Sequence, residues 1–148
     1  MDLSSRAFRI ISTVACVFSI MFFFFIIGLW IYPAQVIAVA TPIKVTTPVV
    51  KRGQEVKFYI HYKKHFDAPE EISQTLDMEQ SRDLTVCGHA TSNKDLPVGD
   101  REANFSMLIP TTCALGRAHI KLIFKYNLHG GMRVFTRTYE TESFMVEK

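Results

Sequence analysis

The strongest constraint on this chain is a long segment without charge. From Ile10 to Ile43 there is no Asp, Glu, Lys or Arg. The first part of this segment, residues 10–31, is almost wholly apolar and interrupted only by small polar residues. A helix of about 20 apolar residues is long enough to cross the hydrocarbon core of a bilayer. We therefore predict a membrane-spanning helix at the N-terminus.

The residues that flank this segment indicate how it would sit in a membrane. Arg6 and Arg9 precede it, whereas the nearest cation after it is Lys44. By the positive-inside rule, the N-terminus is then cytoplasmic and the C-terminal part is periplasmic or extracellular. Trp30 and Tyr32 lie at the end of the apolar run and suit the headgroup layer on the other side. We expect a single-pass protein of the cell (inner) membrane.

The chain divides on this basis into four predicted parts. They are a cytoplasmic N-terminus (1–9), a transmembrane signal anchor (10–32), an extended stalk rich in Pro and Thr (33–42), and one folded domain (43–148). The alternative to the anchor is a signal peptide cleaved after Ala40, which would release a soluble secreted binding module. Cleaved signals have an apolar core of about 7–15 residues, so the longer segment here favours an uncleaved anchor.

The domain has the sequence pattern of strands. Val56, Phe58, Ile60 and Tyr62 alternate with mostly polar residues, which is the period of a half-buried strand. The alternation returns over residues 120–126, and the Gly pair after it predicts a hairpin with a partner strand over 132–140. Further strands are predicted at 43–50, 84–89, 104–109 and 144–146, while 73–80 fits either a strand or one helical turn. About seven short strands without an amphipathic helix predict a mainly β fold, an antiparallel sandwich.

Three segments in order resemble immunoglobulin-like modules. A strand led by Gly53 (48–58), a strand that ends at Pro110 (105–110) and a strand led by Gly116 (116–120) follow the order of strands B, E and F in those modules. The resemblance implies an Ig-like β-sandwich. The chain's only Trp lies in the apolar segment, so the domain resembles bacterial and phage modules rather than antibody domains. An anchor followed by such a module is similar to small membrane proteins of bacteria and tailed phages.

The sequence contains no recognisable catalytic motif. It lacks G-x-S-x-G, a Gly-rich phosphate loop and H-E-x-x-H. Asp95, Asp100 and Glu102 are the nearest thing to paired carboxylates for acid–base chemistry, but they lie in a segment with the composition of a solvated loop. We therefore expect no enzyme activity, no cofactor and no small-molecule substrate. The net charge of +3 is too small to predict a nucleic-acid binder.

Cys87 and Cys113 are the two cysteines outside the apolar segment. An even count in an oxidising compartment is consistent with a disulfide, and two separate thiols are the alternative. Because His89 lies close to Cys87 in the sequence, a small metal or redox protein that uses Cys87, His89 and Cys113 is a further alternative. Structural zinc sites usually have two paired ligand clusters, and the sequence contains no second cluster, so we expect no metal.

Charge is segregated along the domain. Residues 44–64 contain six cations against Glu55, and residues 67–83 contain six acids against Arg82. Self-association would follow if this acidic segment docked on a basic surface of a second copy. Four cations are expected to point outward together on two paired strands and to form a basic interaction face: Lys121, Lys125, Arg133 and Arg137.

This basic face has two interpretations. It is either an ordinary solvated surface or a contact for something anionic, such as lipid headgroups near the anchor. Together with the anchor, it predicts a non-enzymatic membrane protein whose external domain binds a protein or an anionic surface. The domain would then serve as an accessory subunit of a membrane or envelope complex.

Overall fold

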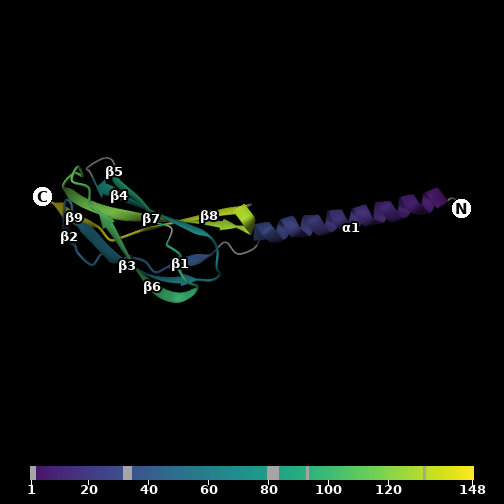
Figure 1. Ribbon diagram of the computed structural model, residues 1–148, viewed down its shortest axis with the longest axis horizontal. Coiled ribbons are helices and arrows are strands. Elements are labelled where there is room, and N and C mark those ends of the chain that lie inside the picture. Colours follow the sequence, from purple (N-terminus) through teal and green to yellow (C-terminus); the bar gives the residue numbers. More distant parts are fainter. Residues whose placement is uncertain (1–2, 32–34, 80–83, 93, 132) are drawn as a thin grey trace. The chain divides into compact units, whose positions relative to one another are not determined.

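The computed structural model describes residues 3–31, 35–79, 84–92, 94–131 and 133–148. The chain divides into two compact units, Met1–Ala34 and Gln35–Lys148. The first contains one helix, α1 (Leu3–Ile31), and the second contains strands (Figure 1). The prediction of a mainly β chain with an N-terminal apolar helix is confirmed.

The helix α1 is long and apolar enough to span a membrane. Its Phe8–Gly28 stretch is apolar, 21 residues long and not buried within the structure. The hydroxyl groups of Thr13 and Ser19 each donate a hydrogen bond of 2.9 Å to the carbonyl four residues earlier. These side chains therefore have hydrogen-bond partners within the helix, as a lipid environment requires.

The second unit contains nine strands among its described residues, rather than about seven. They are β1 (Ile37–Val39), β2 (Val49–Lys51), β3 (Glu55–Lys64), β4 (Glu70–Glu79), β5 (Leu84–Ser92), β6 (Gly99–Leu108), β7 (Gly116–Leu128), β8 (Arg133–Glu140) and β9 (Phe144–Glu147), with a short 3₁₀ turn η1 (His129–Gly131) between β7 and β8. One sheet has the order β1-β3-β6, and the other has the order β2-β9-β7-β4-β5 with β8 also paired to β7. All these pairs are antiparallel, as predicted, except β2–β9, which is parallel.

The alternation in the sequence produces the core. Each inward residue of β3 is buried and each outward one is exposed. Side chains from both sheets belong to one hydrophobic cluster, in which the rings of Phe58 and Phe105 stack at 5.7 Å. Its largest fully buried members include Tyr62, Tyr126 and Phe124.

Strand β4 resolves the ambiguous segment at 73–80. It pairs with β5 on one side and with β7 on the other, and its Ile72 and Leu76 are fully buried. The sequence does not clearly predict this strand, because two of its buried positions carry polar residues, Gln74 and Asp77.

The folded unit begins earlier than predicted. Val36 and Ile37 are fully buried, and β1 pairs antiparallel with the end of β3. Residues from Gln35 onward therefore belong to the folded unit, and a free stalk over 33–42 is wrong for this part. The apolar side chains of β1 cover one edge of the core, which explains why the segment is ordered as a strand. The strand expected at 43–50 is reduced to isolated bridges and the short β2.

Two ends of the sandwich can be defined from β3. The end at Lys64, where the chain enters the unit beside Val36, is called the entry end. The end at Glu55, where β9 lies beside the turn after β2, is called the far end. Ten residues of β strand separate them by about 30 Å.

Candidate functional site

The most unusual chemistry of the domain lies at the entry end, around a buried lysine. The side chain of Lys64 is 0% exposed, and its Nζ donates a hydrogen bond of 2.7 Å to the carbonyl of Leu96. Carboxylate oxygens of Glu70, Asp67 and Asp95 lie 3.4, 3.5 and 3.6 Å from Nζ. We call Lys64 and these three acids the Lys64 cluster. Only Glu70 is buried with it, at 2% exposure, whereas the two aspartates are largely exposed.

The Glu70 carboxylate joins several parts of the chain. One of its oxygens accepts a hydrogen bond from the backbone N–H of Leu96 as well as the contact with Lys64. The cluster therefore ties the end of β3, the start of β4 and the loop that precedes β6. A buried charge needs such compensation, because removal from water is costly for each ion.

Two buried tyrosines border the cluster. Burial and the Glu70 carboxylate raise the pKa of Tyr126 far above its ordinary value. Burial also raises the pKa of Tyr62, whose hydroxyl donates a hydrogen bond of 3.2 Å to the carbonyl of Pro97. Both phenols therefore stay protonated over the physiological pH range.

An open hollow of about 360 Å³ lies beside the cluster, lined by Asp67, Ala68, Pro69, Glu70 and Asp95. Three carboxylates would attract a cation, but the ammonium group of Lys64 already lies among them. The arrangement is an internal ion network that fixes this end of the fold.

The three carboxylates singled out in the sequence do not converge on one site. Asp95 belongs to the Lys64 cluster. Asp100 and Glu102 lie on the outer surface of β6 on either side of His61, at 2.7 and 3.7 Å from its ring nitrogens. A paired-carboxylate centre made of Asp95, Asp100 and Glu102 is therefore not formed.

The prediction of one basic face is wrong, because β8 pairs with β7 in a different register from the one that the prediction assumed. Arg133 and Arg137 pair with buried residues of β7, Arg137 directly opposite Phe124, so they share the inner face of the sheet. Lys121 and Lys125 point to the opposite, outer face. The side-chain period of a strand is two, and a difference of one residue in pairing moves a side chain to the other face. The four cations thus do not form one surface.

The two lysines that do share the outer face have acidic neighbours on adjacent strands. Lys121 Nζ lies 3.0 Å from Asp77 and 3.7 Å from Glu140, and Lys125 Nζ lies 3.6 Å from Glu71. The hydrogen bond to Asp77 raises the pKa of Lys121. We call these five residues the outer ion-pair face. Two acids of the acidic segment, Glu71 and Asp77, thus pair with β7 of their own chain.

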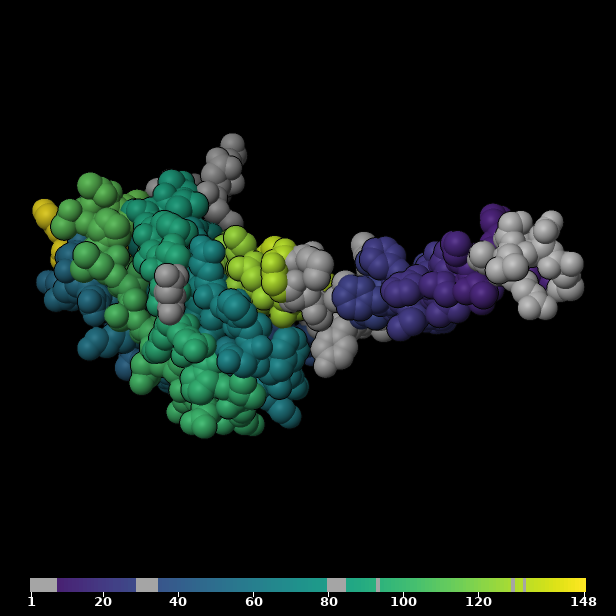
Figure 2. Space-filling view, turned by 45° about the vertical axis from the view of Figure 1, so that its right-hand side comes forward, coloured from purple at the N-terminus to yellow at the C-terminus, as the bar shows by residue number. Residues whose placement is uncertain are grey.

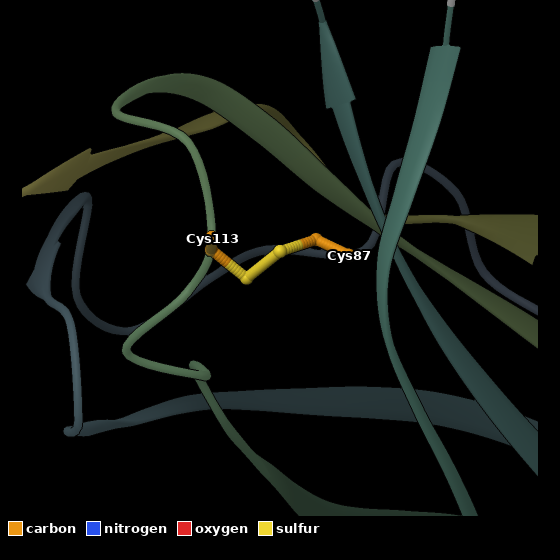
Figure 3. The surroundings of a disulfide bond; sticks show 2 residues. All are labelled: Cys87 and Cys113. Carbon is orange, nitrogen blue, oxygen red and sulfur yellow. A yellow bond between two sulfur atoms is a disulfide. The ribbon is translucent and has the colours of Figure 1, made fainter.

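Cys87 and Cys113 form a disulfide, with their Cα atoms 5.5 Å apart (Figure 3). The bond links β5 to the loop between β6 and β7. His89 Nε2 lies 3.2 Å from the hydroxyl oxygen of Thr91. Among the described residues, no group of three or more His, Cys, Asp or Glu side chains could hold a metal ion.

The residues assigned to the membrane interface lie at the two ends of α1. Arg6 and Arg9 lie in its first turns, and Trp30 lies in its last turn. Tyr32 lies outside the described residues.

Sequence reasoning missed Lys64, although a signal was present. Lys64 continues the alternation Val56, Phe58, Ile60, Tyr62 at the next inward position. Because a buried charge must be paired, a lysine at an inward position predicts a buried acid nearby, and Glu70 is that acid.

Comparison with protein-family models finds no match, and neither does comparison with curated proteins. Three solved structures are similar over 71–77% of this chain at 13–14% identity. They are the sporulation control protein Spo0M of Bacillus subtilis (TM-score 0.45), the neutral ceramidase of Pseudomonas aeruginosa (0.42) and the alkylpurine DNA glycosylase AlkC of Pseudomonas fluorescens (0.43). The similar region covers half of Spo0M, 19% of the ceramidase and 31% of AlkC.

Proposed function

We propose that this chain is a non-enzymatic, single-pass membrane protein with an extracytoplasmic Ig-like β-sandwich that binds another protein. In this proposal it resembles small bacterial or tailed-phage membrane proteins and acts as an accessory subunit of a membrane or envelope complex. The observation that carries the proposal is the exposed apolar surface of α1.

The apolar side chains of α1 are exposed, whereas the folded unit buries its own apolar side chains in a core. Phe18, Phe22 and Phe24 are 65–71% exposed. The hydrophobic cluster of the described chain is formed only by residues from Val36 onward. Since exposed apolar area is unfavourable in water by about 25 cal/mol per Å², a helix of this kind favours a bilayer.

Cleavage after Ala40 is disfavoured by the position of β1. It would remove Val36, Ile37 and Val39, all of which are buried in the core, and it would leave the edge of β3 without a partner. This supports an uncleaved anchor over a secreted module.

Two features support a location outside the cytoplasm. The disulfide between Cys87 and Cys113 is typical of an oxidising compartment, and Arg6 and Arg9 precede α1. They are independent of each other, because one concerns redox chemistry and the other concerns insertion.

The binding surface that we propose lies at the far end. Four exposed apolar side chains occur there, on β2, β6, β9 and the loop that carries Cys113: Val49 (49%), Leu108 (58%), Leu115 (51%) and Met145 (41%). Val49 and Met145 are direct neighbours in the parallel pair β2–β9. Adjacent exposed apolar side chains such as Val49 and Met145 are typical of protein-binding surfaces.

The anchor and the orientation are tested in intact cells. We expect the protein to stay in the membrane pellet after alkaline carbonate extraction, and we expect external protease to digest the domain after outer-membrane permeabilisation. Mass spectrometry should detect residues N-terminal to Thr41 in the mature chain. A mature chain that begins at Thr41 would contradict the anchor.

The binding surface is tested by photocrosslinking in the same cells. A crosslinking residue at Leu115 should capture a protein, whereas the same residue at Thr136, an exposed position on β8, should not. Equal capture at both positions, or none at Leu115, would contradict the far-end surface.

A further inference from the structure

The connection between α1 and the folded unit limits which end of the sandwich can approach a membrane. Helix α1 ends at Ile31, and the folded unit begins at Gln35, four residues later. Four extended residues span at most about 14 Å. Because Val36 is already buried and accepts a hydrogen bond of 2.9 Å from the N–H of His65, a longer tether would require β1 to unfold.

The entry end is therefore the end that a membrane-embedded α1 would hold near the lipid. The far end lies about 30 Å away along β3, which is more than twice the reach of the connection. This step rests on the proposed function, because it assumes that α1 spans a bilayer.

The β7–β8 hairpin belongs to the entry end. Glu70 contacts Lys64 there and pairs with Tyr126, and Asn127 donates a hydrogen bond of 3.1 Å to the carbonyl of Pro69. Beyond this point β7 and β8 continue to pair with each other without β4, and the hairpin extends past it (Figure 1 and Figure 2).

Two exposed apolar side chains lie at this end. Val134, near the turn of the hairpin, is 52% exposed, and Val98, in the loop that leads into β6, is 43% exposed. Gly99, directly after Val98, pairs with Lys64, which locates this loop at the entry end as well. Both valines thus lie at the end of the sandwich where the chain enters the folded unit.

We propose that the entry end rests on the phospholipid surface. Val134 of the β7–β8 hairpin then lies in the headgroup layer, and Val98 faces that layer. Exposed apolar side chains gain free energy when they enter the boundary between headgroups and acyl chains. The contact replaces the four-cation face as the site at which this domain meets lipid. It also holds the far end away from the membrane.

The test is tryptophan quenching in the full-length protein, reconstituted into phosphatidylcholine–phosphatidylglycerol vesicles with acyl-chain bromine. Trp30 is the only tryptophan, so the unmodified protein reports on the end of α1. The reporter variant combines Trp30→Phe with Val134→Trp, and the matched control combines Trp30→Phe with Leu115→Trp. Val134 and Leu115 are similarly exposed, at 52% and 51%, but lie at opposite ends of the domain.

We expect Val134→Trp to lose roughly half of its fluorescence in brominated vesicles, because an interfacial side chain lies within about 5–10 Å of the acyl boundary. Leu115→Trp should retain its fluorescence. Quenching of the native Trp30 without quenching of Val134→Trp, or equal quenching of Val134→Trp and Leu115→Trp, would overturn the inference alone. Failure to quench Trp30 would instead overturn the membrane anchor.

Discussion

Lys64 and Lys125 each form an ion pair with a glutamate, but the two lysine side chains differ in exposure. Each lies on a central strand with a carboxylate at 3.4–3.6 Å. The Lys64 side chain is 0% exposed and that of its partner Glu70 is 2% exposed, whereas Lys125 and Glu71 are 48% and 46% exposed. The Lys64 cluster and the outer ion-pair face therefore compare the same interaction in two dielectric environments.

This comparison indicates that the nitrogen–oxygen distance of an ion pair does not by itself determine its contribution to the free energy of unfolding. A buried charge that loses its partner is left without solvent, at a cost of about 3–5 kcal/mol. An exposed pair contributes only about 0–1 kcal/mol, because water solvates either partner alone. The buried cluster should thus determine the local structure of the entry end, while the outer face should mainly keep the surface soluble.

The largest expected effect comes from Lys64→Met. This change leaves the Glu70 carboxylate buried without its cation, and we expect the free energy of unfolding to fall by about 3–5 kcal/mol. Urea unfolding of the full chain in detergent micelles, followed by far-UV circular dichroism, measures it. A loss below about 1 kcal/mol would contradict the assignment of Lys64 as a buried ion-pair partner.

The double variant Lys64→Met with Glu70→Gln separates charge from packing. The glutamine side chain introduced at position 70 would still accept the hydrogen bond from Leu96 N–H but would carry no charge. We expect it to recover about 1–2 kcal/mol relative to Lys64→Met alone. No recovery would mean that lost packing, and not the unpaired carboxylate, causes the loss.

The next effect concerns alkaline pH. The pKa of Tyr126 is raised in the folded state by burial and by Glu70, so above pH 10 the unfolded chain loses this proton first. Stability is therefore full below pH 10 and falls by about 1.4 kcal/mol per pH unit above it for this group. We expect Tyr126→Phe to reduce that slope in urea unfolding between pH 9 and 11. The control Tyr59→Phe removes a phenol that is 41% exposed, so the difference between the two variants reports on burial.

Lys121 should show an intermediate effect. Its side chain is 28% exposed, but its partner Asp77 is only 5% exposed. We expect Lys121→Met to lower the free energy of unfolding by about 1–3 kcal/mol, between an exposed pair and a buried one, because it leaves the Asp77 carboxylate buried without this cation. Since the hydrogen bond to Asp77 raises the pKa of Lys121, this contribution is present below the unfolded pKa and is lost as pH rises through the folded one. The same urea series at neutral and alkaline pH measures both properties.

The smallest effect is expected for Lys125→Met. Both members of its pair are about half exposed, so the loss should stay below about 0.5 kcal/mol and should vanish in 1 M salt. Unfolding at low and high salt tests this. A loss comparable to that of Lys64→Met would remove the contrast between the two regions.

The sequence predicts the strands better than it predicts which side chains meet. The alternation in β3 and β7 is strong because each strand has one buried and one exposed face. The pairing of β7 with β8 depends on the turn at η1, which contains a kink at Gly130 with φ 69°. A turn of this kind sets the register, and composition alone does not predict it, so the face predicted for Arg133 and Arg137 is wrong.

Long-range pairing explains the other differences. Strand β1 is only three residues long and forms by pairing with the end of β3. Its own sequence does not predict this pairing. Glu70 is likewise an ordinary acid in sequence and becomes the partner of Lys64 only after β3 and β4 have packed. The sequence leaves the disulfide between Cys87 and Cys113 as one of two alternatives, since the bond requires Cα atoms within about 7 Å.

The pairing of β1 with β3 at the start of the folded unit also has a mechanical consequence. The chain enters the unit at one end through Gln35 and leaves β9 at the other end, where Arg52 donates a hydrogen bond to the carbonyl of Glu147. A pull between the entry end and the far end therefore runs along the strands, while the hydrogen bonds of the β1–β3 ladder lie across them. Such a load shears the bonds of the ladder together instead of opening them one by one. If the proposed function holds, the domain is thus suited to carry tension between the membrane and the protein that it binds.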